Sequence, residues 1–275
     1  MAWTDMTALT GLVAWYKPET LAASYANGDP ISTWADSSGN GRDLTGTTTT
    51  RPLALASAIN GYMAADFDGT DDILSSASYT HSGTPNACVV LQHDSMKNFQ
   101  AVVGIDGNSP PVHACDFMTL YGYSTGSYLI ANYPGANAYT TYSGSPVSAG
   151  AFHIITGSVG ADGDLLRVDG KSADKTELRA GAYAATTSGT AYIHLGDIGL
   201  GNSMDGKVAE VVIWTDTFPS SSISWVEGYL AHKYAITLAD GHLFKNAAPE
   251  NAPTAYNAAG GATGSSRLVN GGLVD

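Results

Sequence analysis

Short apolar or alternating runs, separated by turn-forming clusters, repeat along this chain from about residue 10 to residue 245. The runs have the length of β-strands, and Gly, Asn, Asp, Ser and Pro between them favour turns. Because no helical pattern alternates with the runs, successive strands are expected to pair antiparallel. The sequence therefore predicts an all-β fold of two antiparallel sheets, a jelly-roll sandwich, and 275 residues suffice for a sizeable core.

Ten runs are expected to form strands, and the high content of glycine (32) and tyrosine (15) with 13% charged residues agrees with many strands and turns. They are GLVAWYK (11–17), YMAADFD (62–68), NACVVLQHD (86–94), FQAVVGID (99–106), DFMTLYGYS (116–124), SYLIANY (127–133), FHIITGSVG (152–160), LLRVDGK (165–171), AYIHLGD (191–197) and KVAEVVIW (207–214).

One helix and two arms complete the predicted organisation. Residues 218–236 open with a proline and serines and continue with apolar residues at helical spacing, so we expect a helix against an edge of the sandwich. Residues 246–275 are rich in Ala, Gly and Asn and cannot build a core. The predicted parts are an N-terminal arm (1–10), a jelly-roll domain (11–245) and an extended C-terminal arm (246–275).

Charge and the N-terminal sequence restrict the partners. A net charge of −13 without a basic stripe argues against nucleic acid and against an anionic membrane surface. No apolar run is long enough to span a bilayer, and the first residues lack the pattern of a secretory signal, so we expect synthesis in a cytoplasm without export. Cys88 and Cys115 pair only if the fold brings them together; buried free thiols are the alternative we favour.

The sequence gives little support to catalysis. On a strand, a carboxylate pair for glycoside hydrolysis needs acidic residues two apart, whereas Val208 and Val212 flank Glu210, and Asp205 does not share that spacing. GYSTG (122–126) matches a nucleophile motif but leads into a strand instead of a helix. The seven histidines show no paired zinc spacing. We therefore expect a protein that is not an enzyme.

Calcium is the one cofactor that the loops suggest. DGTDD (68–72), ADGD (161–164) and GDIGLGNSMDG (196–206) offer oxygen ligands, and we single out Asp197 and Asp205. The same clusters also fit Asp-Gly turns without a metal, which is the interpretation that we favour.

Two stretches are similar to laminin-G-like, concanavalin A-like jelly-roll domains. The first runs from GLVAWYK through WADSSGNG and FDGTDDIL (11–76), and the second from YIHLGD through MDGKVAEVVIW to the predicted helix (192–236). The resemblance implies that Trp34 anchors a turn whose backbone Asp36 and Asn40 bind, that 68–72 forms a hairpin, and that Glu210 faces outward. It also implies binding to glycans or proteins more often than catalysis.

The first functional hypothesis is a structural or accessory protein of a tailed-bacteriophage virion, in the capsid or the tail. It resembles such proteins in having this fold without an export signal and with a small-residue tail. The jelly roll would face outward, the arms would dock on virion neighbours and sister subunits, and the protein would be a homo-oligomer. The docking residues of the C-terminal arm are expected to be Arg267, Leu268, Val269, Leu273 and Val274.

Two further hypotheses stay open. The second is a carbohydrate-binding adhesin for host-surface glycans, assisted by calcium, in which flat rings stack on sugars; a cross-strand or core role for the same rings is the alternative. The third is a polysaccharide hydrolase. The candidate stacking residues are Tyr121, Tyr123, Tyr128, Tyr133, Tyr139 and Tyr142.

Overall fold

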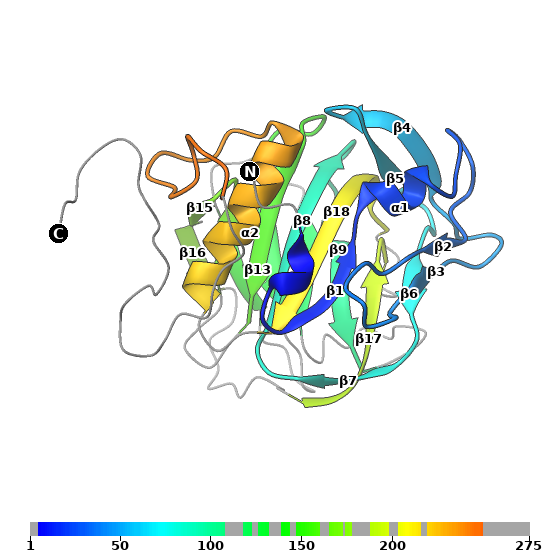
Figure 1. Cartoon of the computed structure of the whole chain (residues 1–275), viewed down its shortest axis with the longest axis horizontal. Coiled ribbons are helices and arrows are strands. Elements are labelled where there is room, and N and C mark those ends of the chain that lie inside the picture. Colours follow the sequence, from blue (N-terminus) through cyan, green and yellow to red (C-terminus); the bar gives the residue numbers. More distant parts are fainter. Residues whose placement is uncertain are drawn as a thin grey trace.

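Two antiparallel β-sheets packed face to face make up the protein, so the predicted all-β sandwich is confirmed (Figure 1). The computed structural model describes residues 5–107, 118–122, 126–131, 139–143, 147–159, 165–172, 174–177, 188–197, 203–215 and 219–249. The described part of the chain has a 3-10 turn, η1 (Met6–Ala8), a short helix, α1 (Pro18–Ala22), and one long helix, α2 (Pro219–Tyr234).

Sheet A has eight strands in the order β15-β14-β13-β8-β18-β5-β4, with β1 also paired to β18. All its ladders are antiparallel. Their bounds are β1 (Leu12–Tyr16), β4 (Leu53–Ile59), β5 (Tyr62–Asp68), β8 (Pro85–His93), β13 (His153–Ser158), β14 (Leu165–Val168), β15 (Lys171–Ser172) and β18 (Asp205–Thr215).

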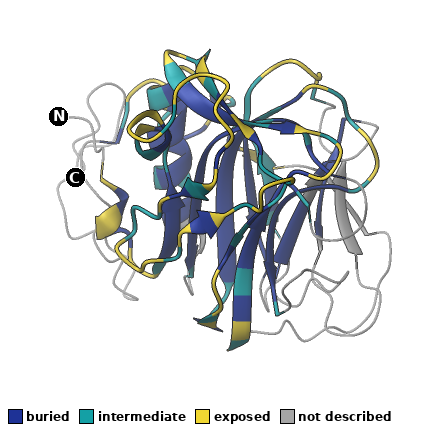
Figure 2. Ribbon diagram, turned by 90° about the vertical axis from the view of Figure 1, so that its right-hand side faces the viewer, coloured by how far each residue is buried: buried dark blue, intermediate teal, exposed yellow. Residues whose placement is uncertain are grey.

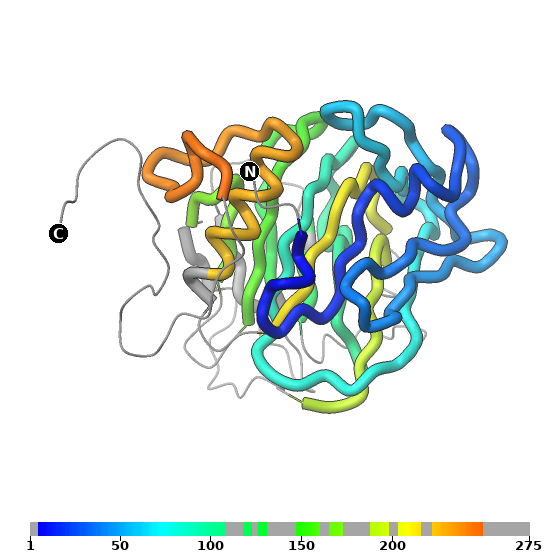
Figure 3. Tube along the Cα trace, viewed as in Figure 1, coloured from blue at the N-terminus to red at the C-terminus, as the bar shows by residue number. Residues whose placement is uncertain are grey.

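Sheet B has ten strands in the order β16-β12-β11-β10-β9-β17-β6-β3-β2, with β7 paired to β17. Figure 3 shows β7 running beside the beginning of β17, at the bottom of the view. The bounds are β2 (Thr33–Trp34), β3 (Leu44–Thr45), β6 (Leu74–Ser76), β7 (Tyr79–Ser82), β9 (Gln100–Asp106), β10 (Met118–Gly122), β11 (Tyr128–Ala131), β12 (Tyr139–Ser143), β16 (Asp174–Glu177) and β17 (Ser188–Leu195).

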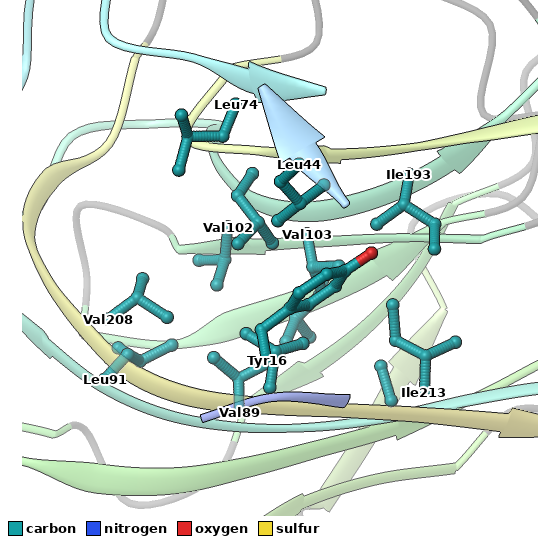
Figure 4. Packing of buried hydrophobic residues seen from close by; sticks show 14 of the residues in the cluster. Tyr16, Leu44, Leu74, Val89, Leu91, Val102, Val103, Ile193, Val208 and Ile213 are labelled. Carbon is teal, nitrogen blue, oxygen red and sulfur yellow. The ribbon is translucent and has the colours of Figure 1, made fainter. Parts of the chain in front are cut away.

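The main core fills the space between the sheets (Figures 2 and 4). Alternation along each strand sends every second side chain into this layer, because successive residues of a strand point to opposite faces. Sheet A contributes Val89, Leu91, Val208 and Ile213, and sheet B contributes Val103 and Ile193 among others. Tyr16 lies among them (Figure 4), and its hydroxyl donates to the carbonyl of Arg42 at 2.7 Å.

A second apolar layer covers the outer face of sheet A. Helix α2 packs there against β13 and β8 (Figure 1), through Ile223, Val226 and Leu230 on the helix and Val90 and Ile154 on the strands. The helix was expected at an edge of the sandwich, and that expectation was wrong. The apolar side chains Cys88, Val90 and Ile154 alternate outward on two neighbouring strands, so the helix is stabilised on a broad sheet face.

The turn between β2 and β3 has the contacts that the resemblance implied for Trp34 and Asp36, whereas the side chain of Asn40 binds strand β1 instead of the turn. Trp34 is fully buried, and its indole N–H donates to the carbonyl of Lys17. The Asp36 carboxylate accepts from the backbone N–H groups of Trp15, Ser38 and Arg42. The Asn40 amide donates to two carbonyls of β1. The loop is not part of a β-ladder, and these polar side chains supply hydrogen bonds to backbone groups that a ladder would otherwise pair.

The stretch 68–72 is not a hairpin, contrary to expectation. Strand β5 belongs to sheet A and β6 to sheet B, so this segment carries the chain from one sheet to the other. The Asp68 carboxylate accepts from the Thr70 backbone N–H at 2.8 Å, as in an Asx turn, and Gly69 has φ +74°. A Cβ at Gly69 would lie 2.7 Å from that of Asp205, so the close approach needs glycine.

Among the described residues, no helix combines the length and the apolar character needed to cross a bilayer. Cys88 is a buried free thiol, and Cys115 lies outside the described residues.

Candidate functional site

A row of hydroxyl, imidazole and small residues crosses the outer face of sheet B. The ladders align one residue from each of six neighbouring strands, β2, β3, β6, β17, β9 and β10, without a break in register. We call these residues the polar row: Thr33, Thr45, Ser75, His194, Gly104 and Thr119.

The row next to it shows that the polar row faces away from the core. Each core residue of that row directly neighbours a polar-row residue along its strand, and neighbours in a strand point to opposite faces. The core row is apolar throughout and consists of Leu74, Leu195, Val103 and Leu120.

The centre of the polar row combines hydrogen-bonding groups with aromatic rings. The Ser75 hydroxyl lies 2.8 Å from Nδ1 of His194, and Gly104, without a side chain, separates His194 from Thr119. The ring of His194 is parallel to that of Tyr192, with 6.2 Å between centroids. His194 and Thr119 are buried, whereas Ser75 and Tyr192 are partly exposed.

Two features of this centre suit a polar ligand. The Thr119 hydroxyl is buried and has no hydrogen-bond partner among the described residues, a situation that proteins usually avoid. Asp106, two residues after Gly104 and therefore on the same face, is buried and pairs in the ladder with Tyr192. Hydroxyl, carboxylate and imidazole groups beside a ring can bind a polyhydroxylated molecule.

The structure places the six predicted stacking tyrosines differently from one another. Tyr128 is 2% exposed in the core between the sheets, where burial raises the pKa of its hydroxyl, so its ring offers no surface to a sugar. Tyr142 lies opposite Tyr128 in the ladder, and Tyr121 lies opposite Leu129. Tyr139 lies opposite Ala131 in the ladder, while Tyr123 and Tyr133 lie outside the described residues.

Sequence reasoning missed the polar row. Each strand alone shows the signal, since LSS, VVGID, MTLYG and YIHL alternate apolar with polar or small residues. The register between β6, β17 and β9 depends on pairing between distant segments, which alternation within one strand does not specify.

A second candidate is a cluster of three aspartates where β5 crosses to β6. The carboxylate oxygens of Asp68, Asp71 and Asp72, which we call the aspartate cluster, all lie within 4.8 Å of one another. Asp68 and Asp71 are exposed and Asp72 is buried. Three hard oxygen ligands at this spacing could hold a metal ion.

Electrostatics in the aspartate cluster favours a cation. Burial raises the pKa of Asp72 to about 6, an effect that the Asp68 backbone N–H partly offsets and that the charges of Asp68, Asp71 and Asp66 increase. A bound cation would remove this repulsion between carboxylates. The residues present therefore fit a metal ion, with Asp68, Asp71 and Asp72 as its ligands.

The predicted metal ligands Asp197 and Asp205 are not members of this cluster. Asp205 is opposite Asp68 in the ladder, but its carboxylate accepts from the Ser95 hydroxyl and lies 4.0 Å from the Lys97 ammonium. Asp197 is partly exposed after β17. The candidate metal site is therefore the turn at residues 68–72 and not the predicted pair of aspartates.

Glu210 faces outward, as expected, but α2 covers it. Its carboxylate accepts from the Trp15 indole at 2.7 Å, the Tyr234 hydroxyl at 2.6 Å and the Lys233 ammonium at 2.6 Å. All three donors hold it in the second apolar layer, so this acid fastens the helix to the sheet.

The predicted arms have different outcomes. Met6 and Leu9, in the expected N-terminal arm, pack into the second apolar layer beside α2. Arg267, Leu268, Val269, Leu273 and Val274 lie outside the described residues. The virion setting, the docking partners and the oligomer stay predictions from sequence.

No protein-family model and no curated protein matches the chain. Its similarities are to solved structures at low identity. A sialidase from Trypanosoma rangeli in complex with sialic acid matches with TM-score 0.54 and 15% identity, over 81% of this chain and 33% of the sialidase. The chain thus spans about a third of the sialidases it matches.

Two other matches cover more of their proteins. An arabinofuranosidase complexed with arabinofuranosyl-alpha-1,2-xylobiose matches with TM-score 0.54 and 17% identity, over 75% of this chain and 50% of that one. Domain 4 of AbnA, a GH43 extracellular arabinanase from Geobacillus stearothermophilus in complex with arabinotriose, matches with TM-score 0.50 and 14% identity. That match covers 76% of this chain and 95% of the AbnA domain.

These matches support the two-sheet sandwich and correct one expectation. The chain was expected not to be an enzyme, whereas the structures that it resembles come from glycoside hydrolases. That expectation rested on spacing within single strands, and spacing says nothing about groups that different strands bring together.

Proposed function

We propose that this chain is a carbohydrate-binding β-sandwich domain, laminin-G-like in its turns, which contacts a glycan with the outer face of sheet B. The polar row carries this proposal, because its hydroxyl and imidazole groups match the hydrogen-bonding groups of a sugar. The buried Thr119 hydroxyl without a partner gives such a ligand a group to bind. The Tyr192 ring, which is partly exposed, supplies a flat surface of the kind that sugars stack on, and the buried His194 ring lies behind it.

The contrast between the two outer faces supports the assignment to sheet B. Helix α2 and an apolar layer occupy the outer face of sheet A. No described helix packs on the strands at the centre of the polar row. Domain 4 of AbnA, whose structure holds arabinotriose, resembles this chain over 95% of its own length, which supports the proposal by analogy.

The test is glycan binding by Thr119→Val, measured by calorimetry with sugars identified on an array. Valine keeps the shape and removes the hydroxyl. If Thr119 binds the glycan, affinity falls about two- to tenfold, the value of one hydrogen bond. The melting temperature stays equal or rises, because the buried hydroxyl has no partner to lose.

The exposed Thr49→Val variant is the control, and it should bind like the wild-type protein. Unchanged affinity of Thr119→Val for every glycan bound by the wild-type protein would contradict the site. The absence of any binding glycan would contradict the function.

We also propose that the aspartate cluster binds calcium, because its ligands are all carboxylate oxygens. Calcium should raise the melting temperature of the wild-type protein but not of Asp71→Asn, which loses an exposed ligand. Asp205→Asn, next to the cluster but not part of it, should respond like the wild-type protein. Equal responses of all three proteins would contradict the metal site.

A further inference from the structure

We infer that the outer face of sheet B accepts neutral glycans and discriminates against sugars that carry a carboxylate. This inference rests on the proposed function and adds the chemical class of the ligand. It concerns the face around the polar row, where the strands supply hydroxyl groups, one imidazole and one carboxylate.

The strands of sheet B are almost free of cations. Across the ten strands the only lysine or arginine is Lys175, on the edge strand β16. The five strands around the centre of the polar row, β6, β17, β9, β10 and β11, have none. Proteins bind sugar carboxylates chiefly through guanidinium or ammonium groups, because a charged donor offsets the loss of hydration.

The arginines whose side chains the structure describes serve other contacts. Arg42 stacks on Tyr79, with 4.4 Å to the ring centroid, and donates to the carbonyl of Val13. Arg167 lies on sheet A, where it pairs with Glu227 at 3.2 Å. Arg51 donates to the carbonyl of Thr48 in its own loop. Arg179 and Arg267 lie outside the described residues.

Three lysines near the sandwich are paired with acids. Lys97 lies beside Asp205, Lys207 contacts Asp94 at 2.5 Å and Lys233 contacts Glu210 at 2.6 Å. Each of these pairs involves sheet A or the turns at its end. A carboxylated sugar at the centre of the polar row would therefore find none of these three lysines free of an acid.

Asp106 adds repulsion to this lack of attraction. Its carboxylate lies on the polar-row face, in a buried position beside the rings of Tyr192 and His194. A buried carboxylate accepts hydrogen bonds from sugar hydroxyls but repels a second carboxylate, and burial strengthens the repulsion. The net charge of −13 works in the same direction.

The experiment measures affinity for matched pairs of glycans by calorimetry. Each pair shares a backbone and differs by a carboxylate: lactose and sialyllactose, oligogalactose and oligogalacturonate, oligoglucose and oligoglucuronate. In every pair that binds, the neutral member should bind about tenfold more tightly or better, since like charges in an interface are strongly unfavourable.

The outcomes separate the inference from the proposed function. Equal or tighter binding of the carboxylated member would overturn the inference and leave carbohydrate binding intact. Failure of both members of every pair, and of every glycan on an array, would overturn the proposed function and the inference with it.

Two further measurements test the physical reason. Affinity for the neutral sugar should be constant from about 0.05 to about 0.5 M salt, because salt screens only charged contacts. Asp106→Asn keeps the size and an acceptor oxygen but removes the negative charge. The ratio of the affinity for the neutral sugar to that for the carboxylated sugar should therefore fall several-fold. A salt-sensitive neutral affinity, or an unchanged preference in a folded Asp106→Asn variant, would overturn the inference.

Discussion

His93 is a residue in which burial opposes protonation. Its ring is 2% exposed between the sheets, 5.8 Å from the ring of Tyr128. Burial lowers its pKa to about 4, although the carboxylates of Asp205 and Asp94 act in the opposite direction. The folded protein therefore holds a neutral imidazole at a pH where the unfolded chain is already protonated.

Acid should destabilise the fold through His93. The pKa of His93 in the folded state is below its unfolded value of 6.5. The contribution of His93 to the free energy of unfolding is therefore full above pH 6.5 and is lost as the pH falls towards 4. A shift of this size corresponds to about 3 kcal/mol. In His93→Leu, the free energy of unfolding should fall less between pH 7 and 4, as measured by urea denaturation at each pH.

The exposed His232→Gln variant controls for the loss of a histidine, and its pH profile should follow the wild-type protein. A His93→Leu profile parallel to the wild-type one would show that the imidazole is not buried in its neutral form.

The pKa of Asp72 is raised by burial, so its effect on the free energy of unfolding changes with pH in the opposite direction to that of His93. Its pKa of about 6 is above the unfolded value of 3.8, so its effect favours the fold at low pH and is lost as the pH rises through 6. Without calcium, Asp72→Asn should raise the free energy of unfolding at pH 8 by about 1–3 kcal/mol and change little at pH 3.5. Asparagine keeps an acceptor for the Asp68 N–H. Destabilisation at pH 8 would contradict the account.

At the scale of elements, two buried glutamates fasten helix α2 to sheet A. Glu210, from β18, binds Lys233 of the helix. Glu227, from the helix, accepts from the Thr156 hydroxyl of β13 and pairs with Arg167 and His242. Buried charges need partners, so each glutamate restricts the helix to one position on an otherwise apolar face.

Glu210→Gln should destabilise the protein by about 3 kcal/mol or more, because it removes one partner of a buried ion pair. Glu19→Gln is the matched control: Glu19 contacts the same Lys233 at 3.0 Å, but its side chain is 49% exposed. It should cost less than about 1 kcal/mol. Similar losses for the two variants in thermal or urea unfolding would contradict the role of Glu210.

Comparing the predicted with the observed elements shows what local sequence patterns can predict. YMAADFD predicted β5 residue for residue, because its apolar side chains alternate. Strands β2 and β3 have two residues each, too few to show a period. The helix was predicted within two residues of its ends, yet its position was wrong, since an apolar stripe does not identify its partner. DGTDD likewise predicted a turn but not the change of sheet.

At the scale of the molecule, the two outer faces differ because their strands alternate differently. On sheet A both faces carry apolar residues, so one side forms the main core and the other binds α2. On sheet B the outer side carries the polar row. Sequence could predict the sandwich from alternation, but not the site, because Ser75, Gly104 and His194 meet only through long-range register.

The most direct test of the account is a map of backbone amide chemical shifts during titration with the tightest-binding neutral glycan. The account predicts that the largest changes lie on β9, β10 and β17, at Gly104, Thr119 and His194 and their neighbours. Changes concentrated on α2 and the outer face of sheet A, with the polar row unaffected, would contradict it.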